Sequence, residues 1–135
     1  MTLLYVDTNV FIDFIKQRTN EEGKDISNSA GKLFSDTLSC KYNIAVSTWA
    51  LKQIYNNIKV EEINMLFIML KKKITKVSYD DEDTQKAKNK SSENFEDAMH
   101  IVLAEKIKAD IIVTRNIDHF IEIGTKILIK KPEWI

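Results

Sequence analysis

Hydrophobic residues in this chain alternate between short runs and stretches with helical spacing. Runs such as Ile111-Ile112-Val113 are typical of buried parallel strands, whereas apolar residues recurring every three or four positions are typical of helices. We expect strands at 3–7, 43–47, 74–78, 110–114 and 125–129. We expect helices at 9–16, 29–40, 48–58, 60–72, 82–88, 95–107 and 118–121. This alternation predicts an α/β fold, a three-layer α/β/α sandwich around a mostly parallel sheet of about five strands.

Two polar segments lie between these elements. Residues 17–28 contain a glycine and show no clear period, which predicts a loop near the exit of the first strand. Residues 86–94 are interpreted as a second polar connection, which leads directly into an acidic cluster. Loops at this edge of a sheet often contact substrates.

The length of the chain, 135 residues, is typical of one domain, so we expect residues 1–135 to form a single domain. Its one cysteine, Cys40, cannot form an internal disulfide, and no apolar run is long enough to cross a bilayer. The chain opens directly into a strand, with no basic and apolar leader pattern. These features favour a cytoplasmic protein with no membrane partner.

Charge changes this picture only by exclusion. Twenty basic and twenty acidic residues give a formal net charge of zero, which argues against non-specific binding of nucleic acid through a broad positive face. Lysines cluster at 71–73, 86–90 and 130–131, and lysine runs on helices are usually solvated faces.

The first candidate for chemistry is Asp7, which follows the first predicted strand. A carboxylate at the carboxyl end of a strand lies where open α/β sheets bind ligands. The alternative is helix capping, since Asp, Thr and Asn are all good N-caps. Thr8 and Asn9 can supply a cap, which leaves Asp7 free to point across the edge of the sheet.

A second acidic cluster, Glu96 and Asp97, begins the helix predicted at 95–107. Acidic side chains in a first turn also stabilise a helix through its macrodipole, so this pair has a purely structural alternative. His100 follows one helical turn later, and we assign it no role.

A third polar cluster, Thr114-Arg115-Asn116, follows the fourth predicted strand and is expected at the same edge as Asp7. The alternative is turn chemistry, because Thr and Asn leaving a strand commonly bond nearby backbone groups. Asp118 and His119 come next, and a histidine beside an acid is more often a surface pair than a metal ligand.

The oxygen-bearing residues Asp7, Asp97 and Asn116, with Asp118 as an additional candidate, suit Mg²⁺ or Mn²⁺ better than zinc. The sequence has no glycine-rich phosphate loop, no C-x-x-C pair and no G-x-S-x-G motif. The functions that depend on these motifs, which are nucleotide binding, redox chemistry and serine hydrolysis, therefore lack their residues.

The ordered motifs resemble the PIN-domain ribonucleases, including VapC-like toxins. They are V-D-T-N-V at 6–10, F-E-D-A at 95–98, V-T-R-N at 113–116 with Phe120 after it, and P-E-W-I at 132–135. The resemblance runs from residue 3 to the last residue. It implies an α/β/α domain and Mg²⁺- or Mn²⁺-dependent cleavage of RNA. It also implies a toxin paired with an antitoxin protein.

The same resemblance assigns roles to residues. Asp7 and Asp97 match the first and third acidic metal ligands, and the fourth acidic position is Asn116 here. Gln53 stands where the family commonly has glutamate, and His119 stands where related chains often have aspartate. Supporting or substrate-binding roles are expected for a wider set: Asn9, Gln53, Glu96, Thr114, Arg115, which is the candidate phosphate contact, and Asp118.

Two other functions stay open at this point. The amides at the two acidic positions are compatible with a catalytically degenerate PIN-like module that binds RNA or protein. A phosphoacceptor receiver domain would use acids after the third strand, where Asp80 and Asp81 lie.

The helices predicted at 48–58 and 60–72 carry more apolar residues than one buried face needs. This surplus indicates either a partner surface, such as a homodimer interface, or a thick core.

Overall fold

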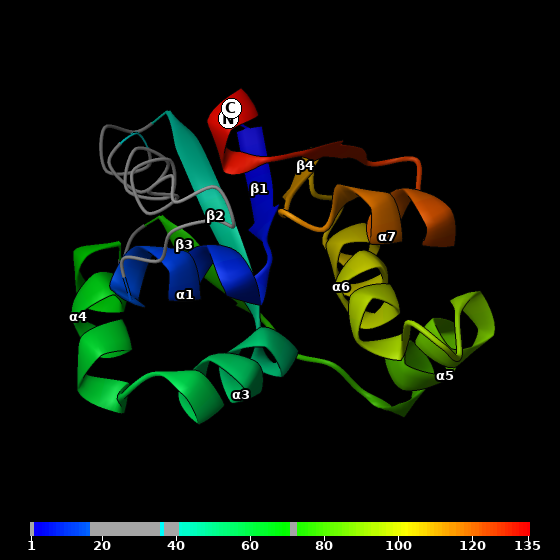
Figure 1. Ribbon diagram of the computed structural model, residues 1–135, viewed down its shortest axis with the longest axis horizontal. Coiled ribbons are helices and arrows are strands. Elements are labelled where there is room, and N and C mark those ends of the chain that lie inside the picture. Colours follow the sequence, from blue (N-terminus) through cyan, green and yellow to red (C-terminus); the bar gives the residue numbers. More distant parts are fainter. Residues whose placement is uncertain (1, 17–35, 37–40, 71–72) are drawn as a thin grey trace.

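The computed structural model describes residues 2–16, 36, 41–70 and 73–135 (Figure 1). Five parallel strands form one sheet in the order β3-β2-β1-β4-β5. Their bounds are β1 Thr2–Val6, β2 Tyr42–Ser47, β3 Ile74–Val77, β4 Ile111–Val113 and β5 Leu128–Lys130. The α/β fold with a parallel five-stranded sheet is therefore confirmed.

Helices follow the strands, as the apolar spacing predicts. Their bounds are α1 Thr8–Lys16, α3 Thr48–Asn57, α4 Val60–Met69, α5 Asp81–Lys90, α6 Phe95–Lys106 and α7 Ile117–Ile123, with a 3₁₀ turn, η1, at Pro132–Trp134. The helix predicted at 29–40 lies outside the described residues except for position 36, as does the loop predicted at 17–28. None of the described helices is long and apolar enough to cross a membrane.

Strand alternation builds two cores, one on each face of the sheet. On β1, Leu4 and Val6 pack with α1, α3 and α4, whereas Tyr5 points to the opposite face and packs with α6 and α7. Val113 and Ile112 of β4 divide between the two faces in the same way. The helices therefore form separate layers above and below the sheet, as the three-layer prediction requires (Figure 1).

Two predicted boundaries are wrong. The fifth strand begins at Leu128 rather than at residue 125, because Gly124 caps the end of α7 with φ +95° and the Thr125 hydroxyl is occupied by Glu105 and by the Ile127 amide. Residues 86–90 belong to α5 and not to a polar connection.

Helix α5 extends further than predicted because both of its ends are stabilised. Asp80 and Asp83 form a capping box at its start, and Lys88 and Lys90 complement the helix dipole in its last turn. The Asp80 side chain is thus the N-cap of α5.

The strand order places a topological switch between β1 and β4, whose carboxyl ends are paired at Val6 and Val113. The helices after these two strands, α1 and α7, pack on opposite faces, which opens a crevice at that edge of the sheet. The order also differs from the 2-1-3-4-5 arrangement of receiver domains, so the phosphoacceptor alternative is wrong.

Candidate active site

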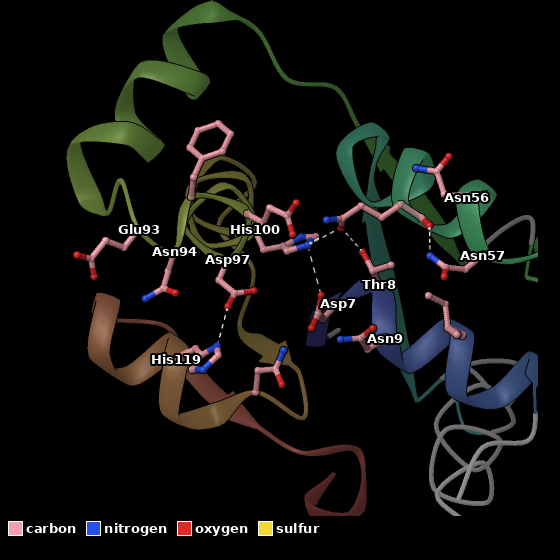
Figure 2. Close-up of a pocket in the computed structure, with 15 residues that line it drawn as sticks. Asp7, Thr8, Asn9, Asn56, Asn57, Glu93, Asn94, Asp97, His100 and His119 are labelled. Carbon is pink, nitrogen blue, oxygen red and sulfur yellow. Dashed lines mark hydrogen bonds and ion pairs between the residues drawn. The ribbon is translucent and has the colours of Figure 1, made fainter. Parts of the chain in front are cut away.

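A cleft of about 740 Å³ opens at the carboxyl ends of β1 and β4 (Figure 2). Of the residues that the sequence singled out, the cleft is lined by Asp7, Asn9, Gln53, Glu96, Asp97 and Asn116. Asp7 comes from the end of β1 and Asp97 from the first turn of α6. The fold therefore brings the two acids to one cleft, as expected from their places in the sequence.

The Asp7 side chain does not cap α1. Its Oδ2 accepts a hydrogen bond from the Thr114 hydroxyl at 2.8 Å, and its Oδ1 lies 3.3 Å from Nε2 of His100. The Thr114 hydroxyl also accepts a hydrogen bond from the backbone N–H of Asn116, so it orders both the carboxylate and the turn after β4. Asp7 is only 3% exposed, yet its carboxylate retains lone pairs for a cation.

Asp97 is electrostatically coupled to Asp7. Burial raises the pKa of Asp97, and the negative charge of Asp7 raises it further. His100 and His119 act in the opposite direction, and His119 Nδ1 lies 3.2 Å from Asp97 Oδ2. The charge of Asp7 thus opposes the ionisation of Asp97, and a cation placed between the two side chains would remove this penalty.

A buried polar network reaches Asp7 from the α6 side of the sheet. The Tyr5 hydroxyl lies 2.7 Å from His100 Nδ1 and 2.9 Å from Ser47 Oγ. His100 Nε2 lies near two acceptors, Asp7 Oδ1 and Gln53 Oε1, and therefore carries a proton. Burial raises the pKa of Tyr5, so its hydroxyl also keeps its proton. This network fixes the orientation of the Asp7 carboxylate.

Gln53 belongs to the same network. Its Oε1 accepts from the Thr8 hydroxyl at 2.7 Å and from His100 at 3.2 Å. An amide oxygen that already accepts two hydrogen bonds is a poor ligand for a metal ion. The Gln53 oxygen is therefore engaged by Thr8 and His100 rather than open to an ion.

Two of the predicted site residues lie elsewhere. Arg115 is paired with Asp13 of α1 and Glu133 of η1, and it lines a neighbouring hollow rather than the cleft. Asp118 is exposed and lines a neighbouring hollow with Arg115 rather than the cleft.

The sequence analysis assigned no site role to several residues that line the cleft. His100 and His119 contact the two acids directly, and Thr8, Asn56 and Asn94 line the walls. One signal was present for His100, because it lies one helical turn after Asp97 and so on the same side of α6. No comparable signal marks Asn56, whose place in the cleft depends on how α3 packs.

The donor set fits a hard divalent cation. Mg²⁺ keeps several waters and needs only one or two carboxylates, which Asp7 and Asp97 can supply. Within the described residues, no group of three or more His, Cys, Asp or Glu is arranged to hold a metal ion. A dedicated cage of the zinc type is thus absent from the described part of the chain.

The acidic cleft lies at the topological switch point of the parallel sheet. This is the edge at which open α/β proteins bind their ligands. A model of the PIN domain family matches residues 4–118, and the chain belongs to this family. No curated protein matches the sequence.

Solved structures share the fold at low sequence identity. VapBC2 from Rickettsia felis, bound to a promoter DNA fragment, is 15% identical with a TM-score of 0.64, covering 96% of this chain and 98% of that one. VapBC-1 from nontypeable Haemophilus influenzae is 13% identical with a TM-score of 0.61, covering 97% and 98%. FitAB bound to the IR36 DNA fragment is 11% identical with a TM-score of 0.60, covering 96% and 95%. These likenesses confirm the PIN-type fold.

Proposed function

We propose that this protein is a metal-dependent endoribonuclease and that residues 1–135 act as one PIN-like domain. The observation that carries the proposal is the coupling of Asp7 and Asp97 within one cleft, where the charge of Asp7 raises the pKa of Asp97. A metal-dependent nuclease needs acidic side chains that bind a divalent cation. Without the ion, the two carboxylates would repel the phosphate of the substrate.

Each residue near the pair has a distinct part in this proposal. Asp7 and Asp97 hold Mg²⁺ or Mn²⁺, and the Asn116 amide oxygen supplies a third ligand. When bound, the ion lowers the pKa of a water molecule and neutralises charge on the phosphate. Thr114 and His100 hold the Asp7 carboxylate in place, and His119 holds Asp97. Asn9 and Glu96 lie on the wall of the cleft, where the RNA would bind.

A cleavage assay tests this proposal. The purified protein should cleave RNA with Mg²⁺ or Mn²⁺, and a chelator should stop the reaction. Asp97→Asn should abolish cleavage, whereas the matched control Asp81→Asn, an exposed acid in the first turn of α5, should cleave normally. Full activity of purified Asp97→Asn would refute the role of this residue.

We further propose that the protein is the toxin of a toxin–antitoxin pair, which would act on RNA in the cytoplasm. The similar structures are described as VapBC and FitAB, two of them with bound DNA. Exposed apolar side chains on α3 and α4 offer a surface for an antitoxin or a second copy of the chain: Tyr55, Val60, Met65 and Ile68. Sedimentation at high concentration tests the homodimer, and co-expression with the product of the adjacent gene tests the antitoxin.

The second candidate function is a degenerate PIN-like module that binds RNA or protein without cleaving it. The observation that favours it is Gln53, whose oxygen is occupied by Thr8 and His100, so the described cleft offers the ion few carboxylates. Calorimetry with Mn²⁺ separates the two functions. A working site should bind the ion and lose binding in Asp7→Asn, whereas a degenerate site should give no heat of binding.

A further inference from the structure

The described lining of the cleft is rich in amide side chains and contains no lysine or arginine. Six of the lining residues are amides: Asn9, Gln53, Asn56, Asn57, Asn94 and Asn116. Amides on both sides of the acidic pair are visible in Figure 2, where Asn56 and Asn57 lie on one side and Asn94 on the other. We propose that these amides read the base edges of unpaired RNA nucleotides next to the scissile phosphate. This inference rests on the proposed nuclease function.

The amides of α3 present a defined pattern of donors and acceptors. The Gln53 oxygen is occupied by Thr8 and His100, which leaves its NH₂ group as the open donor. The Asn57 NH₂ group donates to the backbone carbonyl of Gln53 at 2.8 Å, which leaves the Asn57 side-chain oxygen as the open acceptor. Asn56 makes no side-chain hydrogen bond to the described residues, so both of its groups are available.

Asn94 and Asn116 provide a second, independent observation. Each occupies an N-cap position, at the start of α6 and of α7, and asparagine is among the best N-cap residues. Neither side chain makes a capping hydrogen bond. Both line the cleft instead, so their amide groups face solvent space rather than the helix they precede.

The lining of the cleft is suited to bind the neutral hydrogen-bonding groups of a ligand rather than its negative charges. Phosphate recognition usually depends on lysine and arginine, and the described walls instead carry the acids Glu93 and Glu96 beside Asp7 and Asp97. Asn and Gln pair well with base edges, which offer a donor and an acceptor side by side. Watson–Crick edges are open to a protein only in unpaired RNA, so duplex RNA should be excluded.

A binding cycle tests the inference, with Ca²⁺ replacing Mg²⁺ so that RNA stays intact. The probes are a labelled unpaired RNA octamer, the same strand in a duplex, and the same strand with abasic sites. The variants are Asn56→Ala and Asn94→Ala. The matched control is Asn64→Ala, an exposed asparagine on α4 outside the cleft. Thermal melting confirms that each variant is folded.

We expect the protein to bind the unpaired strand more tightly than the duplex. Each cleft variant should weaken binding of the intact strand by about threefold to tenfold, the value of one hydrogen bond, and should leave binding of the abasic strand unchanged. Asn64→Ala should behave as the unchanged protein does. Equal losses on the intact and abasic strands, no loss at all, or preference for the duplex would overturn base reading.

The outcome separates this inference from the proposed function. If the protein cleaves RNA with Mg²⁺ but the cycle shows no coupling to the bases, base reading is wrong and the nuclease proposal stands. If the coupling is present but no cleavage occurs, the amides read RNA in a protein that is not a nuclease.

Discussion

The Tyr5 hydroxyl lies 2.7 Å from Nδ1 of His100, and the opposite nitrogen of the same ring faces the Asp7 carboxylate. Tyr5 and His100 are 95 positions apart along the chain and both are buried. A strand residue thus orients a helix residue, which in turn orients the acid at the end of the same strand. In known metal sites, the hydrogen-bonded partners of a ligand strongly affect metal affinity, and Tyr5 and His100 would be such partners in the proposed site.

The first prediction concerns Tyr5→Phe. The change removes one hydroxyl and leaves Ser47 Oγ and His100 Nδ1 without this partner in the core. We expect the free energy of unfolding to fall by about 1–3 kcal/mol and Mn²⁺ affinity or cleavage rate to fall by about tenfold or more. Urea denaturation and Mn²⁺ calorimetry measure the two effects.

Tyr42→Phe is the matched control for this prediction. Tyr42 is half-buried on β2, and its hydroxyl makes no hydrogen bond within the described residues. Its loss should leave Mn²⁺ affinity unchanged. Equal Mn²⁺ affinity in Tyr5→Phe and the unchanged protein would show that Tyr5 has no positioning role.

The second prediction concerns the stability of Asp97→Asn without metal. Burial and the charge of Asp7 raise the pKa of Asp97 in the folded protein, so the folded state binds this proton more tightly than the unfolded state does. The ionised side chain therefore costs stability as pH rises above the unfolded value of about 3.9 and through the raised pKa. In chelator at neutral pH, Asp97→Asn should be as stable as the unchanged protein or more stable.

Thermal melting across the pH range checks the expected direction of this stability difference between Asp97→Asn and the unchanged protein. The advantage of Asp97→Asn should shrink in acid, where Asp97 is protonated, and Mn²⁺ should stabilise the unchanged protein more than the variant. A variant that is clearly less stable at neutral pH in chelator would contradict the electrostatic account.

The third prediction concerns the contact between α5 and α6. Lys106 Nζ lies 2.8 Å from Asp83 Oδ2 and 3.0 Å from the Ser78 carbonyl oxygen. Burial raises the pKa of Asp83, but the hydrogen bonds from Lys106 and from the Asp80 amide outweigh it and hold the pKa below its usual value. Lys106→Met should lower the urea midpoint at neutral pH, because it leaves Asp83 buried without its cation.

The pH dependence of this effect has a definite sign. A lowered pKa stabilises the fold above the unfolded value of about 3.9, and that contribution is lost as pH falls through the folded pKa. The penalty of Lys106→Met should therefore narrow in acid. Lys86→Met, which breaks only an exposed pair with Glu82, should change the midpoint little at any pH. Similar decreases of the urea midpoint in Lys106→Met and Lys86→Met would contradict a stabilising role of the pair between Lys106 and Asp83.

Local patterns in the sequence predict most of the fold. The apolar run at 111–113 and the acid after Val6 predict strands and a site at their carboxyl edge, and the structure has the strands and a cleft at that edge. The fifth strand is present, but its predicted start at residue 125 was wrong: β-branched residues favour a strand there, whereas the Thr125 hydroxyl is held by Glu105 on another helix.

Contacts between distant segments explain what the sequence could not predict at the site. The ion pairs of Arg115 with Asp13 and Glu133 join segments that are far apart in the sequence, so no local pattern predicts them. His100 has an obvious place on α6, but its partner Tyr5 is known only once β1 and α6 are packed together. Sequence spacing predicts which face of an element a residue occupies, and tertiary packing decides what that face contacts.

The pairing of β1 with β4 has a consequence for the order in which this molecule acquires its chemistry. Asp7 is synthesised before the Thr114 hydroxyl that holds it, which lies 107 positions later in the chain. A nascent chain that has not yet reached Thr114 therefore carries the first acid without the partner that orients it. The proposed cation site can thus be completed only after β4 has been made and paired with β1.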